Sequence, residues 1–65
     1  MFIEVNARTV DENWTINVRA IAFFCPFNDG TRIYFINDTT PLDVYESYNE
    51  LKEQVKRALS EYKEV

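Results

Sequence analysis

The sequence is poor in the residue types that usually staple small folds or build reactive sites. Among 65 residues there are one cysteine, one glycine, two prolines and no histidine. One cysteine, Cys25, excludes a disulfide within the chain, and the lack of histidine argues against a zinc site. A single glycine is too few for a loop that cradles phosphate. We therefore expect no metal, no cofactor and no disulfide framework.

The lack of histidine also leaves every nucleophile without its usual base. Cys25 stands in the apolar run 23–27, where no base or cationic neighbour would activate it. Carboxylates in turns or near helix ends are typical of structural roles rather than general acid–base catalysis. The chain has three such pairs: Asp11/Glu12, Asp43/Glu46 and Glu61/Glu64. The sequence therefore predicts a protein that is not an enzyme.

Charge and hydropathy narrow the class of partner. The net charge is −4, from 11 acidic and 7 basic residues, and the basic residues are scattered. Binding to a nucleic-acid backbone requires clustered Lys and Arg, so we expect no nucleic acid. No apolar run approaches the length of a membrane span, and residues 1–4 lack the basic start of a signal peptide. We expect a cytoplasmic protein that does not enter a membrane, from a bacterium or a phage.

Alternation of apolar and polar residues predicts strands through most of the chain. The expected strands are Met1–Asn6, Trp14–Arg19, Ala20–Phe27, Thr31–Asn37 and Leu42–Tyr45. Asn28-Asp29-Gly30 is the strongest turn signal, because Asn, Asp and Gly tolerate positive φ. Asn17 is expected to bend the chain, because asparagine favours bonds from its side chain to nearby backbone.

The last third predicts a capped amphipathic helix over about 47–62. Ser47 and Glu50 have the spacing of a reciprocal capping box. Apolar residues then recur at helical spacing. They are Tyr48, Leu51, Val55, Ala58, Leu59 and Tyr62. We expect Leu51, Val55 and Leu59 to form the helix side of the core, against a sheet face that carries Ile3, Val5, Trp14 or Ile16, Ile33 or Phe35, and Val44.

Together these patterns predict one α+β domain over residues 1–65, a small antiparallel meander of about five strands packed by one C-terminal amphipathic helix. One helix covers one sheet face, so the opposite face would expose apolar side chains. The expected interface residues are Phe24, Tyr34 and Ile36, on the alternation opposite to Phe23, Ile33 and Phe35. A register shift of one residue would exchange the two sets. A partly closed barrel would instead enclose both sets.

The order of these segments resembles the FlbD-type family of flagellar and swarming-motility proteins and its uncharacterised bacterial and phage relatives. The resembling residues are 1–5, 16–21, 30–35 and 44–51, so the resemblance extends along nearly the whole chain. They are hydrophobic positions, a turn glycine and the Glu-Ser cap. Residues 38–41 stand where the relatives tend to have a glycine. The resemblance implies a non-enzymatic accessory role and transfers no catalytic residue.

Two classes of function remain. The first is a small protein-interaction module that forms a homo-oligomer or docks a protein partner through the exposed apolar sheet face. The second is a phage or mobile-element inhibitor whose acidic surface blocks a nucleic-acid-binding protein of the host. A discrete homo-oligomer in solution would support the first class. A monomer whose binding to a basic protein depends on salt would support the second.

Overall fold

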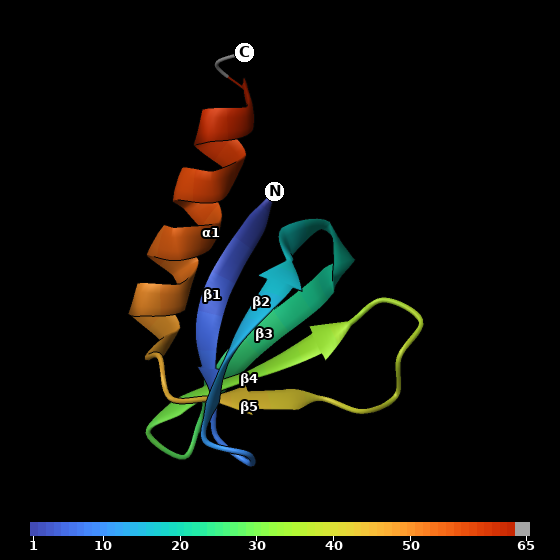
Figure 1. The fold of residues 1–65 in the computed structure, drawn as a ribbon, viewed down its shortest axis with the longest axis vertical. Coiled ribbons are helices and arrows are strands. Elements are labelled where there is room, and N and C mark those ends of the chain that lie inside the picture. The colour runs from blue at the N-terminus through green and yellow to red at the C-terminus, as the bar shows by residue number, and fades with distance from the viewer. Residues whose placement is uncertain (64–65) are drawn as a thin grey trace.

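A computed structural model of the chain describes residues 1–63, with side chains described for residues 1–60. The elements are β1 (Phe2–Ala7), β2 (Glu12–Asn17), the 3-10 turn η1 (Val18–Ala20), β3 (Ile21–Phe27), β4 (Gly30–Phe35), β5 (Leu42–Val44) and α1 (Tyr48–Lys63). All strand pairs are antiparallel, and α1 packs on the sheet (Figure 1). The predicted fold class, five antiparallel strands with one C-terminal helix, is confirmed.

The strands lie in the order β2-β1-β5-β4-β3. A hairpin of β1 and β2 and a meander of β3, β4 and β5 are thus joined side by side through β1 and β5. That junction has one paired position, Ala7 opposite Val44. Two backbone bonds extend it: Tyr45 N donates to Asn6 O at 3.0 Å, and Arg8 N donates to Asp43 O at 2.8 Å. The short strand β5 therefore holds the two halves of the sheet together.

One face of the sheet carries the core. Residues of β1 alternate strictly between exposed and buried, as period-2 geometry requires. The buried apolar side chains form one cluster, which α1 closes from one side. Its members are Ile3, Val5, Ile16, Val18, Ile33, Val44 and Leu51. The core therefore draws on both halves of the sheet and on the helix.

The three residues predicted for the turn between β3 and β4 have different structural roles. Asn28 and Asp29 have φ of 47° and 63°, so they supply the left-handed conformations of a two-residue hairpin turn. Gly30 does not have positive φ. A Cβ at Gly30 would collide with the carbonyl oxygen of Val44. Glycine is required there because β4 and β5 approach closely, not because of the turn.

A β-bulge in β3 exchanges the faces of two phenylalanines. Ile21 lies opposite Phe35, but the register shifts before Phe23, which lies opposite Tyr34. A bulge inserts one extra residue, so the side chains after it change face. Phe24 consequently packs against the core, with its ring centroid 5.6 Å from that of Tyr48. The expectation that Phe24 lies on the outer face is wrong.

Local side-chain bonds shape two bends as predicted. Asn17 Oδ1 accepts from Arg19 N at 3.0 Å and caps η1. At the helix start, Ser47 N donates to Glu50 Oε1 at 2.9 Å and Glu50 N donates to Ser47 Oγ at 3.2 Å. This is the complete reciprocal capping box. It begins α1 at Tyr48 and fixes how the chain leaves β5.

The helix stripe covers less of the core than its sequence suggests. Leu51 is fully buried, and Val55 and Ala58 pack against the core. Leu59 is 42% exposed, so its predicted place in the core is wrong. A helix of 16 residues spans about 24 Å, and its last turns extend past the N-terminal end of β1 (Figure 1). The Tyr62 side chain and the pair Glu61/Glu64 lie outside the described residues.

Replacing Ser47 with alanine should lower the free energy of unfolding by about 1 kcal/mol, because the Glu50 amide loses its acceptor. Urea denaturation of the wild type and Ser47→Ala measures this loss. Ser60→Ala, an exposed change within the same helix, is the control and should be close to neutral. Equal stabilities for Ser47→Ala and wild type would show that the cap contributes nothing.

Replacing Gly30 with alanine should destabilise the fold by about 1–3 kcal/mol, because the new methyl group forces β4 and β5 apart. Asn28→Gly serves as the control, since glycine accepts the positive φ at that position. Both can be compared by thermal unfolding. A Gly30→Ala protein as stable as Asn28→Gly would mean that the contact with Val44 relaxes without cost.

Candidate functional site

The half of the inner sheet face that α1 leaves uncovered forms an apolar groove. Two hollows of about 310 Å³ and 440 Å³ adjoin there. Both are lined by Trp14, Phe35, Leu42 and Asp38. The remaining lining residues are Ala7, Thr9, Val10, Ile16, Asn17, Ala20, Ile36, Asn37, Thr40 and Pro41. This surface is called the apolar groove below.

Curvature of the sheet creates the groove. Trp14 on β2 and Phe35 on β4 are separated by two intervening strands. In a flat sheet such positions would be about 14 Å apart, yet both line the same hollows. The sheet therefore curls, as twisted antiparallel sheets do, while β2 and β3 remain its two outer strands. The sheet is curved but not closed into a barrel.

The groove is apolar in its floor and sparsely charged at its rim. Asp38 is the only charged residue among those that line it. Trp14 is 41% exposed and its indole Nε1 donates to Glu12 Oε1 at 3.1 Å. Ile36 and Val10 are 54% and 48% exposed. Adjoining exposed apolar side chains of this size are typical of interaction surfaces.

The loop between β4 and β5 forms one wall of the groove. Asn37 adopts a φ of 62° and turns the chain directly after Ile36. Asp38 Oδ1 then accepts from Thr40 N at 3.0 Å, an arrangement that asparagine and aspartate favour in turns. The wall is therefore built by local side-chain bonds, and it holds Ile36 at the rim.

The outer face of β3 and β4 carries a second, more polar set of rings. Phe23 stacks on Tyr34 with ring centroids 4.5 Å apart. The Arg32 guanidinium lies 3.7 Å from the ring centroid of Phe27. It also donates to both oxygens of Asp43, at 2.7 Å and 3.0 Å. Phe23 remains 58% exposed, so this face is also partly open to solvent.

The structure separates the three predicted interface residues. Ile36 is exposed at the rim of the apolar groove. Tyr34 is half-buried beneath Phe23 on the outer face. Phe24 packs into the core. Sequence reasoning missed Trp14, Val10 and Leu42 as surface residues, because it assigned the inner face of the sheet entirely to the helix.

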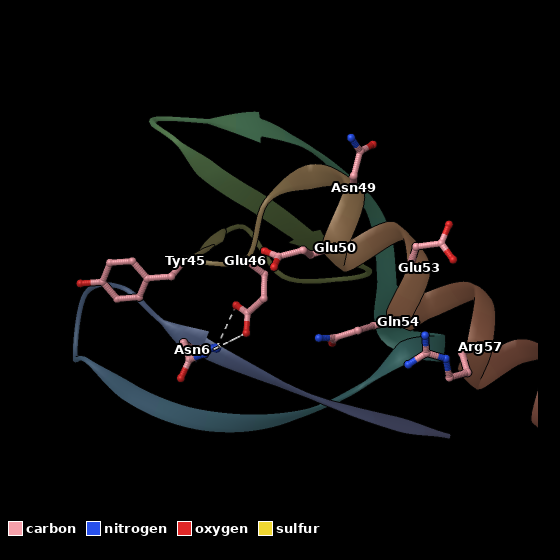
Figure 2. Close-up of a pocket in the computed structure, with 8 residues that line it drawn as sticks. All are labelled: Asn6, Tyr45, Glu46, Asn49, Glu50, Glu53, Gln54 and Arg57. Carbon is pink, nitrogen blue, oxygen red and sulfur yellow. Dashed lines mark hydrogen bonds between the residues drawn. The ribbon is translucent and has the colours of Figure 1, made fainter.

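A polar groove lies between β1 and the first turns of α1 (Figure 2). Its volume is about 630 Å³, and it is lined by Asn6, Tyr45, Glu46, Asn49, Glu50, Glu53, Gln54 and Arg57. The Glu46 carboxylate accepts from Asn6 N at 3.0 Å and 3.1 Å and from Asn6 Nδ2 at 3.0 Å. The Glu46 carbonyl accepts from the buried Thr31 hydroxyl at 2.8 Å. Glu46 thus ties the helix start to β1 and β4.

The polar groove has no constellation for metal binding. Across the described part of the chain, no group of three or more His, Cys, Asp or Glu side chains could hold a metal ion. Glu46 is engaged with Asn6, and Glu50 is engaged with Ser47. The polar groove therefore presents mainly hydrogen-bond acceptors, and its lining residues carry a net negative charge.

Comparison with protein-family models, with curated proteins and with solved structures finds no match for this chain. Within the described residues, the structure contains no helix with the length and apolar character of a membrane span. Function is therefore argued from the surfaces themselves.

The Arg32–Asp43 pair predicts a dependence of stability on acid. The pKa of Asp43 is lowered from its ordinary value of 3.8, chiefly because Arg32 donates hydrogen bonds to the carboxylate, while burial opposes this shift. The stabilisation is therefore complete above about pH 4 and is lost as the pH falls through the pKa of the folded protein. Asp43→Asn should be less stable than wild type at pH 7, and the gap should shrink below pH 4.

Urea unfolding of both proteins between pH 2 and 7 measures that gap. Asp29→Asn, a change of equal charge in the β3–β4 turn, is the control and should show no comparable closing of the gap. A difference between wild type and Asp43→Asn that stays constant over the whole range would contradict the assignment.

Proposed function

We propose that the chain is a non-enzymatic protein-interaction module that associates with further copies of itself through the apolar groove. The observation that carries this proposal is the groove's composition and exposure. Trp14, Phe35 and Leu42 line it, α1 does not cover it, and Ile36 and Val10 are exposed at its rim. An apolar surface of this kind on so small a domain is best removed from water by a second protein surface.

The size of the chain favours a second copy as the occupant. A domain of 65 residues buries a modest fraction of its surface, and small domains without disulfides or metals often gain stability from oligomerisation. Burying apolar surface contributes roughly 25 cal/mol per Å². Self-association would therefore stabilise the fold and cover the groove at once.

The resemblance to the FlbD-type family supports the same class of function. That family has an accessory role without catalysis, which agrees with a chain that lacks histidine. We propose a cytoplasmic location because the sequence has no apolar run of membrane-spanning length and residues 1–4 lack the basic start of a signal peptide.

A second candidate is an inhibitor that presents an acidic surface to a nucleic-acid-binding protein. The observation that favours it is the position of Glu46, Glu50 and Glu53 around one groove, in a chain of net charge −4. Such a surface would compete with phosphates for a basic site, and its binding would weaken steeply with salt.

Light scattering at increasing protein concentration distinguishes the two candidates. Self-association through the groove predicts a mass above 7.7 kDa for the wild type. Ile36→Lys should dissociate the oligomer, because a charge at the rim cannot be buried without a partner. Leu59→Lys changes another exposed apolar residue, on α1 and away from the groove, and it should leave the mass unchanged. A wild-type mass of 7.7 kDa at every concentration would overturn the proposal.

A further inference from the structure

Strand β1 is paired with β5 only at its C-terminal end. Val44 pairs with Ala7, and Tyr45 N still donates to Asn6 O, but the chain then turns away into α1. The Glu46 carboxylate accepts a hydrogen bond from the Asn6 amide, so no further strand can pair at this end of the edge. The edge ahead of Asn6, toward the N-terminus, has no neighbouring strand.

The backbone direction of that open stretch follows from the register. Val18 N donates to Met1 O at 3.0 Å, so the odd-numbered residues of β1 direct their amide and carbonyl groups at β2. In an antiparallel ladder the alternate residues face the other way. Phe2 and Glu4 therefore direct their backbone groups at the side where β5 is missing. The described residues provide no hydrogen-bond partner for these groups.

The helix stands opposite this open edge and forms a slot with it. A hollow of about 400 Å³ lies between Phe2, Ile3 and Glu4 on β1 and Gln54, Arg57 and Ala58 on α1. Gln54 and Arg57 also line the polar groove, so the two hollows adjoin. This combined space is called the β1–α1 slot. It is bounded by a strand edge on one side and a helix on the other.

A buried acceptor in the slot has no donor. Gln54 Oε1 is buried and has no hydrogen-bond partner among the described residues. Figure 2 shows the Gln54 side chain reaching from α1 toward β1, near Asn6. Buried polar atoms are nearly always bonded, and each exception calls for an explanation. Rotation of the Gln54 amide toward the slot would expose this atom to a donor from a bound chain.

The charges that line the slot indicate what kind of partner segment would bind there. The carboxylates of Glu4, Glu46, Glu50 and Glu53 line the slot, and Arg57 is the only cation among its lining residues. The unpaired Gln54 atom is also an acceptor. The slot therefore favours a ligand rich in donors and positive charge.

We propose that the β1–α1 slot binds an extended, lysine- or arginine-containing segment of a partner protein, which adds to β1 as a strand. The segment would lie beside β1 where a longer β5 would have continued. Its backbone would form hydrogen bonds with Phe2 and Glu4. Strand addition to an exposed edge supplies affinity through main-chain bonds and specificity through alternate side chains. Its cationic side chains would lie toward Glu50 and Glu53. This site is separate from the apolar groove and does not depend on self-association.

An NMR titration of the full chain with a capped eight-residue peptide of alternating lysine and valine tests the site. The proposal predicts shifts of the Phe2 and Glu4 backbone amides and of the Gln54 side-chain amide. A peptide with glutamate in place of lysine should not bind. Absence of binding by the lysine peptide at millimolar concentration, or binding that leaves those three signals unmoved, overturns the proposal.

Three variants make the test specific. Glu4→Pro removes the amide that faces the slot and spares the ladder to β2, and it should weaken binding about 3–10-fold. Gln54→Met removes the buried acceptor and should weaken binding to a similar degree, which keeps the test valid if the proline variant does not fold. Glu53→Gln should weaken binding, whereas Asp29→Asn, an equal change of charge in a distant turn, should not. Equal weakening by Glu53→Gln and Asp29→Asn would show only general charge attraction and would overturn the site.

Discussion

The pairing of Ala7 with Val44 is the contact on which the rest of the structure depends. It is the only paired position between β1 and β5, and it joins the N-terminal hairpin to the C-terminal meander. Both side chains are fully buried. Gly30 has no side chain because Val44 lies against it. Loss of this junction would separate the β1–β2 hairpin from the β3–β4–β5 meander, and an isolated two-stranded hairpin is marginally stable in water.

The shortness of β5 explains both surfaces to which function is assigned. Because β5 has only three residues, most of the β1 edge that faces β5 stays unpaired. The chain then starts a helix beside that edge. The helix covers the core near Leu51 and leaves the Trp14 end of the inner face open. The apolar groove and the β1–α1 slot thus both result from the early point at which the chain leaves β5 and begins α1. A longer β5 would fill the slot and shift the helix.

Much of the fold could be predicted from the sequence, since its signals are local. The capping box at Ser47, the turn at Asn28 and Asp29, and the alternation in β1 each depend on residues close in the chain. The strand order could not be predicted, because Ala7 and Val44 are distant in sequence and hydrophobic alternation does not specify which strands meet. The bulge before Phe23 has no local signature, and it placed Phe24 in the core. The sequence leaves open whether Trp14 or Ile16 lies beneath the helix, because it does not show where a helix crosses a sheet.

The interpretation of function depends on the proposal that another copy of the chain covers the apolar groove. Trp14 is the only tryptophan and lines the groove, so its fluorescence reports the state of that surface directly. If another copy covers the groove, the Trp14 emission should be blue-shifted at high protein concentration. On dilution it should move to longer wavelength, because the indole becomes hydrated. Emission that keeps one wavelength from nanomolar to submillimolar concentration, with the chain folded throughout, would contradict it.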